Sequence, residues 1–178
     1  DYSIESSSMQ QASVTPQPRM TRLFVAVELP NDVKQELLRL EKIFQDSSLL
    51  IGNYPQSDAM HMTLKFIGNV PEEKITGIRQ LLRGVVAKSM KAQLKLLKAF
   101  GNPRWPKVLY VDVDCPQLYS LVLRFDEVLT DFCAPEEREF KSHVTIARVK
   151  QTLDSDGLLK LLHATYVSPI VFSIDHFS

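Results

Sequence analysis

Two copies of one short motif constrain the fold more than any other feature of this sequence. His61 and Thr63 flank one apolar residue in the first half, and His143 and Thr145 do the same in the second half. An apolar residue also follows each threonine. Because side chains of a β-strand alternate between its two faces, histidine and threonine share one face and the apolar pair the other. The sequence therefore predicts two strands, each with a buried back and a polar front.

The rest of the chain alternates between helical and extended patterns. Apolar residues repeat at helical spacing and predict helices over residues 31–44, 71–85, 116–132 and 156–164. Runs of β-favouring residues predict strands around both motifs and over residues 22–28, 93–100, 107–112 and 170–175. Residues 47–59 carry glycine, asparagine and proline and are predicted to form a loop. Helices interleaved with strands indicate the α+β class, with two halves of similar plan that each hold one motif.

Length and composition fit one globular domain behind a tail. The chain has 178 residues, of which 44% are hydrophobic and 24% charged, values that are ordinary for a folded domain. Residues 1–20 are rich in serine, glutamine and proline without apolar periodicity, so we expect a disordered tail, a linker or an added segment there and a domain over residues 21–178. The formal net charge is zero, so the chain has no excess of positive charge to attract a long nucleic acid. A nucleic-acid partner would then be a short end or a nucleotide.

Cysteine spacing and hydropathy indicate the compartment. Cys115 and Cys133 show neither the spacing of a metal site nor that of a disulfide framework. No apolar run reaches the length of a membrane span, and no secretory signal opens the chain. We therefore expect a reduced, cytoplasmic protein that does not associate with membranes.

The paired motifs suit the cleavage of a phosphodiester. An imidazole has an unperturbed pKa of about 6.5, so it can take or give a proton near neutral pH, and two imidazoles supply both a base and an acid. Two threonine hydroxyls can donate hydrogen bonds to the non-bridging oxygens of a phosphate. No carboxylate or third histidine stands at ligand spacing from either motif, so we expect no metal and no cofactor.

Three stretches carry a resemblance to a known family, namely residues 22–30 (RLFVAVELP), 61–68 (HMTLKFIG) and 142–148 (SHVTIAR). In this order they resemble the two-histidine phosphoesterase superfamily, in particular its RNA 2',3'-cyclic phosphodiesterase branch, historically called 2'-5' RNA ligases. The resemblance implies two antiparallel sheets, backed by helices and related by a pseudo-twofold, around a central groove with one motif in each lobe. It also implies a monomer that hydrolyses cyclic phosphates on RNA ends or nucleotides without a metal.

The resemblance assigns roles to the four motif residues. It implies that His61 protonates the leaving oxygen and His143 activates water, while Thr63 and Thr145 hold the phosphate and a 2'-phosphate remains. The sequence is also compatible with the reverse assignment of acid and base. Three other activities stay open, namely cleavage of 2'-5' oligonucleotides, the reverse ligase reaction, and nucleotide or RNA binding without catalysis.

Other residues are weaker candidates for substrate binding. In a regular strand Lys65 shares the face of His61 and Thr63, so it is a candidate phosphate ligand or else a solvated lysine at the strand end. Arg148 matches an arginine that the family places beside the phosphate, but its parity requires a β-bulge or the end of the strand to bring it inward. Phe24 resembles an aromatic near the family's base pocket, and its alternative place is the core.

The remaining candidates lie at a predicted hairpin tip and near the end of the chain. Arg104, Trp105 and Lys107 could steer RNA or form a solvated loop. His163 and His176 lack the motif and are expected to be surface or core residues. Because the family continues beyond its last strand, we expect the sequence as given to stop short of that continuation.

Overall fold

The computed structural model describes residues 15–178, so most of the predicted tail lies outside the described residues. No described helix is long and apolar enough to cross a membrane. The elements follow the order β1 (Met20–Glu28), α1 (Asn31–Asp46), β2 (Leu50–Asn53), β3 (His61–Pro71), α2 (Glu72–Arg83), β4 (Met90–Asn102), β5 (Trp105–Asp114), α3 (Gln117–Val128), β6 (His143–Thr152), α4 (Ser155–Ala164) and β7 (Val171–Ile174).

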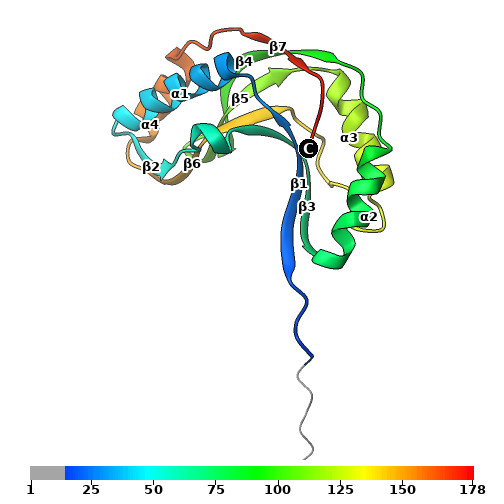
Figure 1. Ribbon diagram of the computed structural model, residues 1–178. Coiled ribbons are helices and arrows are strands. Elements are labelled where there is room, and N and C mark those ends of the chain that lie inside the picture. Colours follow the sequence, from blue (N-terminus) through cyan, green and yellow to red (C-terminus); the bar gives the residue numbers. More distant parts are fainter. Residues whose placement is uncertain (1–14) are drawn as a thin grey trace, which may run out of the picture.

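The strands form two antiparallel sheets. Within the described residues β1 pairs with β3 in a two-stranded sheet, and the other five strands pair in the order β2-β6-β5-β4-β7. Each sheet therefore contains one motif strand, β3 in the small sheet and β6 in the large one. The backbone of Ser178 exchanges two hydrogen bonds with Ala26, which places the last residue beside β1 (Figure 1).

Helices cover each sheet on the side away from the other sheet. α1 and α4 contact strands of the large sheet, whereas α2 and α3 contact β3 (Figure 1). α1 buries the apolar stripe that its sequence spacing predicts, which consists of Val33, Leu37, Leu40 and Phe44. α3 likewise buries Leu118, Leu121 and Phe125.

The predicted class, mixed α and β with two antiparallel sheets, is confirmed. One element was missed, because β2 lies inside the predicted loop over residues 47–59. Its four residues include Gly52 and Asn53, which are typical of turns. They form a strand because β6 offers an edge to pair with. The hairpin strands β4 and β5 are also longer than predicted and leave only Pro103 and Arg104 between them.

Candidate active site

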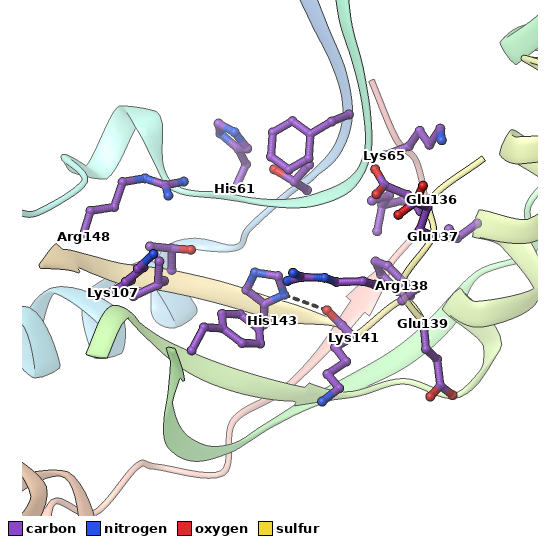
Figure 2. A pocket seen from close by; sticks show the side chains of 18 of the residues that line it. His61, Lys65, Lys107, Glu136, Glu137, Arg138, Glu139, Lys141, His143 and Arg148 are labelled. Carbon is purple, nitrogen blue, oxygen red and sulfur yellow. Dashed lines mark hydrogen bonds between the residues drawn. The ribbon is translucent and has the colours of Figure 1, made fainter. Parts of the chain in front are cut away.

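The two motif strands contribute to the lining of one cavity of about 1640 Å³. His61 and Thr63 enter it from β3, and His143 and Thr145 enter it from β6 (Figure 2). The four motif residues are partly exposed, whereas the apolar residues that alternate with them, Met62 and Val144 among them, are buried. The faces predicted from the alternation of residue types are therefore the faces that the structure shows.

The ring of His143 is held in one orientation. Its Nδ1 lies 2.6 Å from the carbonyl oxygen of Lys141 (Figure 2). A carbonyl oxygen only accepts hydrogen bonds, so Nδ1 carries the proton and Nε2 of the neutral ring has a free lone pair. The rings of Phe100 and Tyr110 lie 5.1 and 5.3 Å from that of His143, in edge-to-face geometry. This arrangement suits a general base.

The environment of His61 is different. The ring of Phe24 stacks on it with 4.9 Å between centroids and 13° between planes. Partial burial lowers the pKa of His61, and the positive charge of Lys34 lowers it further. An anion bound beside the ring would oppose both effects and favour the protonated form.

Matching β-bulges follow both motifs. In β6, Thr145 pairs with Tyr110 and Ala147 with Leu109, which leaves Ile146 as the extra residue. In β3, Thr63 and Lys65 pair with consecutive residues of β1, which leaves Leu64 as the extra residue. A bulge reverses the alternation of the residues that follow it.

The bulge in β6 brings Arg148 to the face of His143 and Thr145, where it lines the cavity. Figure 2 shows its guanidinium reaching toward the side of His61. The inward placement that we made conditional on a bulge is therefore what the structure shows. The equivalent position of β3 is Phe66, which also lines the cavity.

The structure places Lys65 at the cavity but holds its side chain in an ion pair. The bulge at Leu64 moves Lys65 off the strand face of Thr63, and only 1% of its side chain is exposed. Its Nζ lies 2.8 Å from Oδ1 of Asp126 and donates a hydrogen bond to the carbonyl oxygen of Ala134. Lys65 is thus not a solvated lysine at the strand end, and its ion pair joins β3 to α3. A contact from Lys65 to the phosphate stays a prediction.

The other candidates have mixed outcomes. Phe24 is not part of the core, because it is 40% exposed and stacks on His61, and it is not among the residues that line the cavity. Its place beside a base stays a prediction. At the hairpin tip Lys107 lines the cavity, whereas Arg104 and Trp105 are not among its lining residues. His163 and His176 are exposed and lie away from this cavity.

Sequence reasoning missed several residues that line the cavity. Arg138 belongs to the segment between α3 and β6, and in Figure 2 its side chain extends toward His143. Three glutamates of the same segment line the cavity as well, namely Glu136, Glu137 and Glu139. Arg22 enters from β1 and Tyr119 from α3. These residues share no local motif, so only the tertiary structure brings them together.

Comparisons with known proteins agree with this geometry. Residues 27–110 match the model of the family described as LigT-like phosphoesterase, a match that includes the first motif. An RNA 2',3'-cyclic phosphodiesterase of Methanocaldococcus jannaschii is 30% identical over 129 residues, which cover 72% of each chain. The chain belongs to the LigT-like phosphoesterase family. A relative of Archaeoglobus fulgidus with the same description is 30% identical over 73% of each chain.

Solved structures of similar fold include further LigT-like proteins. The structure of TT0787 from Thermus thermophilus superposes with a TM-score of 0.71 at 22% identity, and the match covers 88% of this chain and 86% of the other. That of Escherichia coli LigT complexed with 3'-AMP has a TM-score of 0.69 at 19% identity, with 89% and 86% covered. The fold of the LigT-like phosphoesterases is therefore present here.

Proposed function

We propose that this protein hydrolyses 2',3'-cyclic phosphates at RNA ends, without a metal, and leaves 2'-phosphates. The observation that carries the proposal is the entry of both His-x-Thr motifs into one cavity from separate sheets. The family membership supports it, as do the relatives described as RNA 2',3'-cyclic phosphodiesterases. Escherichia coli LigT, whose fold is similar, has been crystallised with 3'-AMP, a ligand that joins a phosphate to a nucleoside.

In the proposed reaction His143 acts as the base. Nε2 of His143 takes a proton from water as the water oxygen bonds to phosphorus, and the bond between phosphorus and O3' breaks. His61 donates its proton to O3', which leaves a 3'-hydroxyl and a 2'-phosphate. The hydrogen bond from Nδ1 of His143 to Lys141 supports this assignment, because it leaves Nε2 as the acceptor.

The remaining residues of the site bind the phosphate in this proposal. The hydroxyls of Thr63 and Thr145 donate hydrogen bonds to the non-bridging oxygens, where charge accumulates in the transition state. Arg148 follows the bulge along β6, and its guanidinium adds a charge-assisted hydrogen bond to the phosphate. The anion raises the pKa of His61 and so supplies the protonated acid that the step needs.

A turnover assay on adenosine 2',3'-cyclic phosphate in the presence of a chelator tests this proposal. We expect the adenosine 2'-phosphate isomer as product and a fall in kcat of roughly 10²- to 10⁴-fold for His61→Asn or His143→Asn, as for loss of a general acid or base. His163→Asn is the matched control and should keep full activity. Full turnover by either motif variant, or no turnover by the wild type, would overturn the proposal. Parallel assays with 2'-5' oligonucleotides test the alternative activities.

A further inference from the structure

Three exposed apolar side chains line the same cavity as the motif residues. Phe66 of β3 is 49% exposed, and Tyr119 and Leu123 of α3 are 45% and 46% exposed. All three line the cavity. We call these three residues the apolar platform. Large apolar side chains exposed together in a groove are typical of a binding surface, and an aromatic face suits a nucleobase.

The small sheet places Phe66 next to the motif and places a cation beyond it. Thr63 lies opposite Ala26, Phe66 lies opposite Phe24, and Arg22 lies further along β1, opposite Asn69. With one bulged residue between them, Thr63 and Phe66 are about 7 Å apart along the strand, at about 3.3 Å per residue. Along the small sheet the hydroxyl of Thr63 therefore comes first, the aromatic ring of Phe66 second and the guanidinium of Arg22 third.

Arg22 is available for a ligand. It is exposed, it lines the cavity, and within residues 15–178 it forms no salt bridge. The carboxylates that line the cavity from Glu136, Glu137 and Glu139 belong to the segment between α3 and β6, not to β1. A negatively charged group of a ligand is therefore attracted to Arg22 on β1 and repelled by the glutamates of that segment.

An RNA end has its chemical groups in the same order. The cyclic phosphate is followed by the terminal nucleoside with its base, and then by the phosphate on the 5' oxygen. We propose that the terminal base lies on the apolar platform and that Arg22 binds the 5'-phosphate of the terminal nucleotide. This inference rests on the proposed function. It makes the preferred substrate class the end of an RNA chain, or a nucleotide with a 5'-phosphate, in place of a free nucleoside cyclic phosphate.

The test compares two substrates that differ only in the 5'-phosphate. Adenosine 2',3'-cyclic phosphate and its 5'-phosphorylated form are assayed with wild type, Arg22→Gln, Arg22→Lys and the control Arg79→Gln, an exposed arginine of α2 outside the cavity. We expect the wild type to favour the 5'-phosphorylated substrate by roughly 5- to 30-fold in kcat/KM, as for a charge-assisted hydrogen bond. Arg22→Gln should bring this ratio close to one. Arg22→Lys should restore part of the ratio, and Arg79→Gln should leave it unchanged.

A further variant and a binding measurement separate the possible outcomes. Phe66→Ala should lower kcat/KM for both substrates by about fivefold or more, since both carry the base, and should leave their ratio unchanged. A wild-type ratio of one, an unchanged ratio in Arg22→Gln, or full activity in Phe66→Ala overturns the inference while the proposed function stands. If the wild type turns over neither substrate, the proposed function fails. Calorimetry then decides the inference, which requires adenosine 2',5'-bisphosphate to bind more tightly than adenosine 2'-phosphate in wild type but not in Arg22→Gln.

Discussion

At the scale of single residues, the two motif histidines differ although their sequence contexts match. His143 donates a hydrogen bond from Nδ1 to the backbone and so presents Nε2 as an acceptor. His61 stacks on Phe24, and its pKa is lowered by burial and by Lys34. This asymmetry comes from the surroundings of each strand and was not visible in the motifs themselves. The hydrogen bond of His143 favours it as the base. The lowered pKa of His61 means that a bound anion has to restore its protonated form before it can act as the acid.

Removal of the Lys34 charge tests that assignment through the pH dependence of kcat/KM. Lys34 lowers the pKa of His61, so Lys34→Gln should raise that pKa. An acid is active while protonated, and its pKa sets the alkaline limb of the profile. We therefore expect the alkaline limb of Lys34→Gln to move to higher pH while the acidic limb stays in place. A shift of the acidic limb instead would show that His61 is the base.

At the scale of elements, the bulges decide which residues reach the cavity. Strict alternation correctly placed His61, Thr63, His143 and Thr145 on cavity-facing sides. It could not place the residues after Leu64 and Ile146, because nothing in the sequence marks either as an extra residue. Lys65 therefore lies off the strand face that alternation predicted for it, and Phe66 was overlooked.

The position of Arg148 was anticipated for a different reason. The alternation of residue types placed Arg148 on the face opposite His143 and Thr145. Only its resemblance to a family arginine suggested that a bulge brings it to the motif face. The contribution of α3 and of the segment before β6 to the cavity depends on tertiary packing, so no pattern in the sequence revealed Tyr119 or Arg138 as lining residues. Local periodicity thus predicted the class and the motif faces, whereas the full extent of the cavity required the structure.

The ion pair that joins β3 to α3 should contribute to stability. The Lys65 and Asp126 side chains are 1% and 17% exposed, and removal of one partner of a buried pair typically costs roughly 3–5 kcal/mol. Lys65→Met should lower the free energy of unfolding in urea by about that amount. It should change KM for the cyclic phosphate little, because the ion pair with Asp126 holds the Lys65 ammonium.

The matched control is Lys98→Met, which breaks the partly exposed Lys98–Asp112 pair. It should cost no more than about 1 kcal/mol. Equal losses for the two lysine variants, or a large rise in KM for Lys65→Met with unchanged stability, would contradict the structural role given to Lys65.

At the scale of the whole molecule, one buried acid makes stability depend on pH. Burial of Glu41 in α1 raises its pKa from 4.5 to about 7. The folded protein therefore binds this proton more tightly than the unfolded chain does. The Glu41 contribution to stability should fall as pH rises from about 4.5 to about 7, because ionisation of the buried carboxyl is then required in the folded state.

Glu41→Gln removes this titration. Thermal unfolding should show a higher Tm for Glu41→Gln than for wild type at pH 8, and a much smaller difference near pH 4.5. Glu127→Gln, at an exposed position of α3, is the control and should follow the wild type at both pH values. A Glu41→Gln variant that is less stable than wild type at pH 8 would show that the ionised carboxylate has a partner in the folded protein.

The proposed reaction requires that motif residues from two strands of separate sheets act on one phosphate. The most direct measurement is an NMR titration of the wild type with adenosine 2'-phosphate, followed through the imidazole resonances of His61 and His143. We predict that both resonances shift along curves with the same Kd and a stoichiometry of one, while those of His163 and His176 stay in place. If only one motif histidine responds, or if the two report different Kd values, the motifs do not share a ligand and the account is wrong.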